Sequence, residues 1–304
     1  MPTNQYHRQH GMILLGLMIA LLLSSGLYWI NQTNRLFTKS GQDSTDANVL
    51  QQAKEALLAR AIGDANRPGS LPCPALTSEG NALAPPCSTF VGWLPWRSLD
   101  IPDLRDSAGE RLWYVLSPAF QDYGTINSNS ISSLSLDGNT GIAAIVIAPG
   151  AVLLNQSRPS NSPADYLDAK NNNSLTSNND GDDSYFSASS DEKFNDKVVA
   201  LTTASLFSGV SKRILSEVGH AFSTGGIIPF ADTDNDGLAN PGEQLGRFPY
   251  KEAAFAIHST SWYSASPPFH LWHESLVTNG WMPLISYARL TRTISLNGQA
   301  LTLP

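Results

Sequence analysis

The chain has little cysteine and little charge for its 304 residues. Only two cysteines occur, Cys73 and Cys87, which argues against zinc modules built on four cysteine ligands. Lysine and arginine number 19 against 26 aspartate and glutamate residues, so the formal net charge is −7, and no basic cluster stands out. Because nucleic acid is bound through concentrated positive charge, we expect no nucleic-acid partner.

Familiar catalytic motifs are missing as well. The sequence contains no G-x-S-x-G, no phosphate-binding P-loop and no G-x-G-x-x-G. The segment His270-Leu-Trp-His273-Glu274 has neither the H-E-x-x-H nor the H-x-x-E-H order, so we interpret it as a partly buried histidine pair rather than a zinc site. We therefore predict no enzyme, and a triad assembled in space from distant Ser, His and Asp residues stays open as the alternative.

The two cysteines are fourteen positions apart and lie among prolines. In an oxidising compartment such a pair is most simply a disulfide, so a Cys73–Cys87 bond is expected. Closing a loop of that size stabilises a protein by about 3 kcal/mol in the chain-entropy model. Two unrelated buried thiols are the alternative. The prolines expected to keep the loop extended are Pro72, Pro74, Pro85 and Pro86.

The most apolar segment is Met12–Ile30, nineteen residues without a charge. A helix of that length, at about 1.5 Å per residue, crosses most of a hydrocarbon core roughly 30 Å thick. We therefore expect a cytoplasmic stub at 1–11, a single transmembrane helix at 12–30 and an extracytoplasmic domain at 31–304.

This apolar segment has four possible interpretations. It is a permanent anchor, or a secretory signal cut near Ser24-Ser25-Gly26. It is also similar to a prepilin leader cut between Gly11 and Met12, which would leave the apolar helix on the mature chain. Such leaders usually have a glutamate where this chain has Gly16. A buried core helix is the fourth interpretation.

Two amphipathic helices are expected in the domain. Asp46 has the side chain of a typical N-cap, and apolar residues then recur at helical spacing over 47–62. A second helix is expected to begin at Asn195 or Asp196 and to end near Val218, just before a glycine.

Strand patterns complete the predicted α+β fold, which has an antiparallel sheet and large loop insertions. The runs 111–116 and 141–148 are apolar and rich in β-branched or aromatic residues. The dipeptide Asn297-Gly298 predicts a type I′ hairpin turn. The tract 155–191 is rich in Asn, Ser and Asp, so we expect a mobile surface insertion that buries little.

An acidic segment fits the spacing of a twelve-residue calcium loop. Oxygen-bearing side chains occupy its alternating early positions, and Gly237 stands at the sixth, where the chain must turn sharply. Neither flank is helical in character, so we predict a structural calcium staple in an irregular or β setting, and an acidic turn without metal is the alternative. The expected ligands are Asp232, Asp234, Asp236, the Leu238 carbonyl, Asn240 and Glu243.

Large aromatic residues gather in two stretches of the chain. Core packing is the default interpretation, and a recognition surface for a partner protein or a glycan is the alternative. The residues are Trp93, Trp96, Trp113, Trp262, Tyr263, Phe269, Trp272 and Trp281.

Several short segments together resemble a known group of proteins. The resemblance covers roughly Met12 to Leu201, and it is carried by AKEALLARA, LPCP, GWLPWRSL, LRDSAGERLWYVLSPAF, IAAIVIAPG and FNDKVVALT, in this order. With the prepilin-like N-terminus, they resemble bacterial type II secretion or type IV pilin-like proteins. Members often carry an acidic calcium-type repeat near LPCP, whereas here it begins at Asp232.

The resemblance implies a long N-terminal helix in the bacterial inner membrane and a pilin-like α+β domain in the periplasm or at the cell surface. The implied partners are other pilin-like or secretion-system subunits. The rival hypothesis is an anchored or secreted, calcium-stabilised enzyme or glycan-binding domain.

Overall fold

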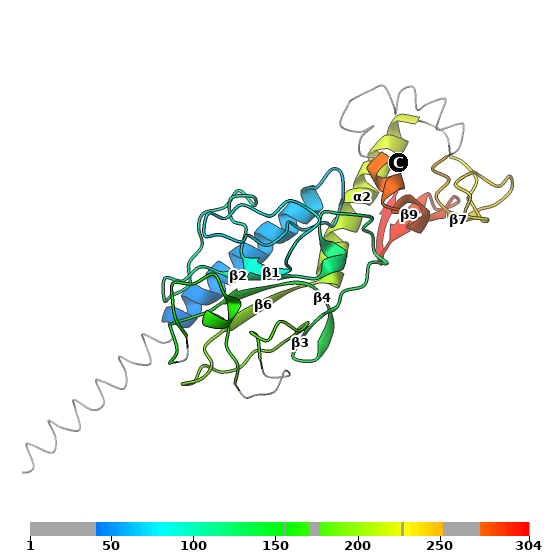
Figure 1. The fold of residues 1–304 in the computed structure, drawn as a ribbon. Coiled ribbons are helices and arrows are strands. Elements are labelled where there is room, and N and C mark those ends of the chain that lie inside the picture. Colours follow the sequence, from blue (N-terminus) through cyan, green and yellow to red (C-terminus); the bar gives the residue numbers. More distant parts are fainter. Residues whose placement is uncertain (1–40, 155, 171–176, 226–227, 252–273, 304) are drawn as a thin grey trace, which may run out of the picture. The chain divides into compact units, whose positions relative to one another are not determined.

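The computed structural model describes most of the chain (Figure 1). The described residues are 41–154, 156–170, 177–225, 228–251 and 274–303. The predicted span 12–30 and the cleavage pair Gly11–Met12 lie outside them. Within the described ranges, no helix combines the length and apolar character needed to cross a membrane. Two compact units are distinguished, Met1–Asn48 and Val49–Pro304, and the architecture below is that of the second.

The described chain combines helices with β-strands, so the α+β class is confirmed. Residues 41–63 and 274–278 are helical. The other elements are β1 (Val91–Trp93), β2 (Trp113–Leu116), η1 (Pro118–Phe120), β3 (Leu134–Leu136), β4 (Asn139–Ala148), η2 (Pro163–Asp165), β5 (Ser184–Tyr185), β6 (Lys197–Thr202), α2 (Thr203–Gly225), β7 (Leu245–Arg247), η4 (Met282–Leu284), β8 (Ser286–Ala288), β9 (Thr293–Leu296) and β10 (Gln299–Thr302).

The larger sheet has six strands and is organised around β4, the apolar run expected at 141–148. β2, β3 and β6 each pair with β4 in antiparallel orientation. β1 extends the sheet beyond β2, again antiparallel. The antiparallel prediction therefore holds except for β5, which pairs with β3 in parallel.

The smaller sheet has four strands in the order β10-β9-β8-β7. β9 and β10 form the predicted hairpin, with Leu296 opposite Gln299. The two turn residues, Asn297 and Gly298, have φ values of 49° and 74°. Positive φ at both positions is the type I′ requirement, and asparagine and glycine tolerate it best.

The larger sheet is buried on both faces because its strands carry apolar residues on both sides. On one face, Tyr114 and Val146 share a core with Leu57 of the N-terminal helix and Val210 of α2. This core continues into the smaller sheet through Ile294. The amphipathic stripe expected for the first helix is therefore the buried stripe.

Aromatic side chains form much of the core on the opposite face. The Trp93 ring lies 4.3 Å from the Trp113 ring and 4.8 Å from that of Tyr166, centre to centre. Trp281 is also fully buried, in the other core. For these tryptophans the core interpretation holds. The other aromatic residues of the second stretch, Trp262, Tyr263, Phe269 and Trp272, lie outside the described residues.

The second helix begins later than the sequence pattern suggested. The expectation of helix from Asn195 or Asp196 is wrong, because residues 197–202 form β6 and complete the sheet beside β4. β-Branched residues favour a strand there. Helix α2 then starts at Thr203, with the hydroxyl oxygen of Thr202 accepting a hydrogen bond from the Ser205 backbone N–H (3.2 Å).

The end of α2 and the start of the first helix also differ from expectation. α2 continues past Val218 to Gly225. Gly219 lies within the helix and does not end it. A Cβ at this position would lie 2.6 Å from Leu301 of β10, so the glycine permits close packing between α2 and β10. Asp46 is not an N-cap, because the helix described from residue 41 already contains it.

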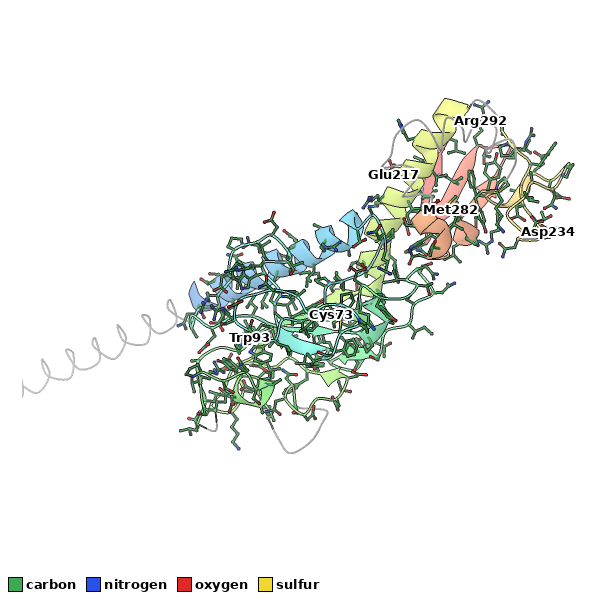
Figure 2. All side chains as sticks on the ribbon, turned by 45° about the horizontal axis from the view of Figure 1, so that its top comes forward. Cys73, Trp93, Glu217, Asp234, Met282 and Arg292 are labelled. Carbon is green, nitrogen blue, oxygen red and sulfur yellow. A yellow bond between two sulfur atoms is a disulfide. The ribbon has the colours of Figure 1, made fainter. Side chains whose placement is uncertain are left out.

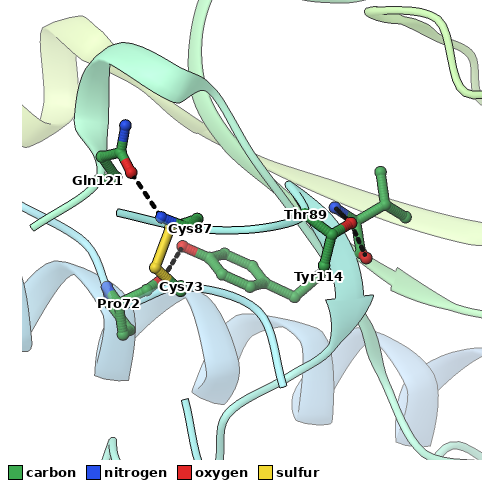
Figure 3. Close-up of a disulfide and its surroundings, with 7 residues drawn as sticks. Pro72, Cys73, Cys87, Thr89, Tyr114 and Gln121 are labelled. Atoms are coloured by element: carbon green, nitrogen blue, oxygen red, sulfur yellow. Dashed lines mark hydrogen bonds between the residues drawn. A yellow bond between two sulfur atoms is a disulfide. The ribbon is translucent and has the colours of Figure 1, made fainter. Parts of the chain in front are cut away.

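A disulfide joins Cys73 to Cys87, as predicted (Figure 3). Hydrogen bonds hold the same segment from both sides. The buried Tyr114 hydroxyl donates to the Pro72 carbonyl (3.2 Å), and the Cys87 N–H donates to Gln121 Oε1 (2.8 Å). Burial raises the pKa of Tyr114 well above its ordinary value, so the phenol keeps its proton as a donor.

The polar tract 155–191 is more deeply packed than its composition suggested. Tyr166 and Leu167 belong to the core beneath the sheet, and Phe186 packs on Phe194 with ring centres 4.5 Å apart. The expectation that this tract buries little is therefore wrong for its described part. Its many polar groups bond to one another, which offsets the cost of their burial. Its mobility stays a prediction.

Two buried carboxylates close this tract onto β6. Asp168 and Asp196 are 3% and 1% exposed. The Asp196 N–H donates to Asp168, and the Asp168 N–H donates back to Asp196 at 2.9 Å. Asn178 bridges to the same Asp196 oxygen at 3.0 Å. Burial, aided by the charge of Asp168, raises the pKa of Asp196 well above its ordinary value.

This raised pKa predicts a pH-dependent stability. The neutral form of Asp196 stabilises the fold fully below the ordinary pKa of 3.8, and this contribution is lost as pH rises through the raised value. We expect the free energy of unfolding of Asp196→Asn to match that of the wild type near pH ~4 and to exceed it near pH ~7. Urea midpoints across this range measure it. The exposed Asp180→Asn is the control, and equal stability losses at all pH values for Asp196→Asn would contradict the expectation.

Candidate metal centre

Three aspartates of the predicted calcium loop come together in the structure. One carboxylate oxygen each from Asp232, Asp234 and Asp236 lies within 4.8 Å of the other two. Asp232 is fully buried, whereas the other two side chains are exposed, and Figure 2 labels Asp234 in this loop. A buried carboxylate at the base with exposed carboxylates above it could bind a metal ion.

The loop folds around the Asp232 side chain. Its two oxygens accept hydrogen bonds from the backbone N–H groups of Asn235 (2.6 Å) and Gly237 (2.8 Å). These two residues have positive φ, 62° and 90°, the left-handed region that asparagine and glycine tolerate. The acidic pattern and the glycine therefore act together, because the glycine lets the chain wrap the first carboxylate.

The setting of the loop is irregular chain followed by a strand. Asp232 and Arg247 exchange two backbone hydrogen bonds, with the Asp232 N–H donating at 3.0 Å, which ties the start of the loop to β7. Ala231 is likewise bonded to the Glu243 carbonyl. The prediction of a β or irregular setting, rather than two flanking helices, is confirmed for the described residues.

The three other predicted ligands are not part of the carboxylate group. The Asn240 amide oxygen accepts hydrogen bonds from the Thr233 N–H (2.6 Å) and hydroxyl (3.0 Å). Glu243 is exposed, and its backbone N–H donates to the Asn240 carbonyl. The Leu238 N–H donates to Asp236 Oδ1 at 2.7 Å. Metal ligation by Leu238, Asn240 and Glu243 therefore stays a prediction.

A lysine beside the loop was missed by sequence reasoning. Lys251 Nζ donates to the Asp236 carbonyl at 2.9 Å, and the Lys251 N–H donates to the Gly237 carbonyl at 2.7 Å. No spacing rule gives this contact, because Lys251 lies beyond β7. Three carboxylates this close repel one another when ionised. A single ammonium bonded to a backbone oxygen leaves most of that repulsion in place, and a bound cation would relieve it.

The donor set narrows the kind of metal. Every candidate ligand is an oxygen, and hard cations such as Ca²⁺ and Mg²⁺ prefer oxygen, whereas soft metals prefer sulfur. The alternative histidine segment, His270 and His273, lies outside the described residues.

Comparison of the chain with protein-family models, with curated proteins and with solved structures found no match in any of the three.

Proposed function

We propose that this protein is a membrane-anchored, pseudopilin-like assembly subunit of the bacterial envelope. The uncharged segment 12–30 would hold it in the inner membrane as a single span. The disulfide-bonded α+β domain would stand in the periplasm or at the cell surface and contact other pilin-like or secretion-system subunits. Its work would be docking rather than catalysis.

One observation carries this proposal, the uninterrupted helix over 41–63. A pilin subunit begins with an apolar helix that runs on into an amphipathic one, so a break near Asp46 would have counted against the resemblance. The helix contains Asp46 instead, and its apolar stripe of Leu50, Ala53 and Leu57 is buried in the domain. A helix packed along an antiparallel sheet is the arrangement that the resemblance implies.

We further propose calcium as the ion of the loop around Asp232. Calcium takes six to eight oxygen ligands in flexible geometry, and the loop spacing supplies carboxylates at positions 1, 3 and 5. Magnesium demands a tighter octahedron and holds its water more firmly. The ion would stabilise the domain rather than act as a switch, because the loop runs into β7 and the described residues around it contain no flanking helix pair.

Two matched glycine variants test the anchoring mode. Mass spectrometry of the mature N-terminus should give a start at Met12. Gly11→Val should block this cleavage, because it changes the residue before the cut, whereas Gly26→Val should leave it unaffected. A start near Gly26 that only Gly26→Val blocks would mean an ordinary secretory signal, and it would overturn the assembly proposal in favour of a released domain.

A further inference from the structure

A single buried carboxylate fixes the turn at 105–111. Asp106 is 4% exposed, and its Oδ1 accepts the backbone N–H groups of Ala108 and Glu110, both at 2.9 Å. Its Oδ2 accepts the Gly150 N–H at 2.8 Å, just after the end of β4. The turn is thereby tied to the sheet, and its side chains project from a fixed backbone.

Two arginines face each other across this turn. Arg105 and Arg111 are opposite partners of an antiparallel bridge, which places them side by side, where like charges destabilise. Asp103 accepts from both, at 2.7 Å from Arg105 Nη2 and 3.1 Å from Arg111 Nε. One carboxylate thus serves two guanidinium groups. The terminal nitrogens of Arg111 make no hydrogen bond within the described residues.

The arginine pair lines a cavity of about 470 Å³. This volume falls in the range of small-molecule sites, about 300–1,000 Å³. Other walls come from Tyr166, Ser160 and Asn161 of the polar tract and from Trp93 of β1, which Figure 2 labels. Trp93 is 5% exposed, and its indole N–H has no hydrogen-bond partner among the described residues. The indole nitrogen is itself buried, so Trp93 contributes its ring to the wall of the cavity.

The charges around the cavity leave an excess of positive charge. Its charged lining residues are Arg105, Arg111 and Glu110. Glu110 lies 3.5 Å from Arg158, whose side chain is only 3% exposed and whose guanidinium stacks on the Tyr166 ring at 4.5 Å. The charge of Glu110 is therefore offset by Arg158, not by the two arginines of the lining. An excess positive charge in a chain of net charge −7 indicates an anionic ligand.

We infer that this cavity binds a carboxylate, either on a small organic acid or on an acidic side chain of a partner peptide. The open edge of the Arg111 guanidinium matches the two oxygens of a carboxylate, and the Trp93 ring forms a wall of the same cavity. A single negative charge balances the excess of the lining. A phosphate dianion would place a second charge next to Glu110.

The test follows the indole signals of full-length protein in detergent, labelled with ¹⁵N at the tryptophan indole. Trp93→Phe assigns the Trp93 signal among the seven tryptophans. The probes are succinate, the capped peptide acetyl-Gly-Glu-Gly-amide and its uncharged analogue acetyl-Gly-Gln-Gly-amide. The site variant is Arg111→Gln. Arg111→Lys keeps the positive charge but removes the fork, which is the planar pair of guanidinium donors that can bind both carboxylate oxygens. The control is Lys212→Gln, an exposed α2 residue whose change alters the net charge equally.

A carboxylate probe should shift the Trp93 signal in a saturable way. Saturation by succinate identifies a site for free acids, and saturation by the glutamate peptide alone identifies a partner's side chain. Affinity should fall at least about tenfold in Arg111→Gln and be retained in Lys212→Gln. Loss of comparable size in Arg111→Lys would show that the fork is required. No saturable shift with either acid, equal binding of the glutamine peptide, or unchanged affinity in Arg111→Gln would each overturn the inference.

Discussion

Replacing Cys73 and Cys87 together by alanine should lower the free energy of unfolding by about 2–4 kcal/mol. The two residues are 14 positions apart, so the bond removes loop-closure entropy from the unfolded chain. The hydrogen bonds from Tyr114 and Gln121 to this segment persist without the bond. We therefore expect a less stable protein with the same fold, rather than a rearranged one.

Urea unfolding with calcium held constant measures this loss as a shift of the midpoint at constant slope. Dithiothreitol should lower the midpoint of the wild type and leave that of the double alanine variant unchanged. Alanine is the better replacement because Cys73 is buried, and a serine hydroxyl there would need its own partner. Equal midpoints for variant and wild type in the absence of reductant would contradict the prediction.

The features predicted correctly from the sequence depend on neighbouring residues. The Asn297-Gly298 turn needs only two residues that tolerate positive φ, and β4 needs only a continuous apolar run. The disulfide prediction needs only two cysteines and the expectation of an oxidising compartment. Each of these signals is local, so no knowledge of the remaining fold was required.

The features predicted wrongly depend on distant partners. Residues 197–202 carry an apolar pattern compatible with a helix or a strand. Backbone pairing with β4 favours the strand. Gly219 resembled a helix end because a glycine often follows the last turn of a helix. Its packing against Leu301 could not be predicted, because Leu301 is far along the chain. The composition of the polar tract suggested that it could not pack. The hydrogen bond between Asp168 and Asp196 could not be predicted from composition, because it joins the middle of the tract to a residue beyond its end.

The same division applies to the two candidate sites. The spacing of Asp232, Asp234 and Asp236 indicated their convergence, because neighbouring loop positions turn toward one centre. The contribution of Lys251 and the cavity of Arg111 could not be predicted from spacing. Their partners lie on other elements, and only the fold brings those elements together.

Calcium should raise the melting temperature of the wild type, and Asp234→Ala should abolish that rise. The three carboxylates converge within 4.8 Å, so the protein without metal bears their repulsion. An ion that binds only the folded state adds about 2.7 kcal/mol at a hundredfold excess over Kd. For a unit of this size, such a gain corresponds to a rise of about 5–10 °C.

The matched control is Asp180→Ala, which removes one exposed carboxylate from another acidic turn. It should retain the full calcium-dependent rise, since Asp180 is not part of the carboxylate group. Asp234→Ala should keep the Cys73–Cys87 bond, because that bond lies in a separate segment. Loss of the rise with the bond intact would therefore locate the effect at the loop.

Glu243→Gln separates the two ways in which the loop could hold its ion. If Glu243 swings in to close the loop, this variant should weaken calcium binding about as much as Asp234→Ala does, because a bidentate glutamate supplies two of the ligands. If the three aspartates hold the ion with water, Glu243→Gln should behave like the wild type. Magnesium should substitute poorly in either case. A wild-type melting curve unaffected by chelator, with no calcium binding by calorimetry up to about 1 mM, the weak end for extracellular modules, would show that the loop is only an acidic turn.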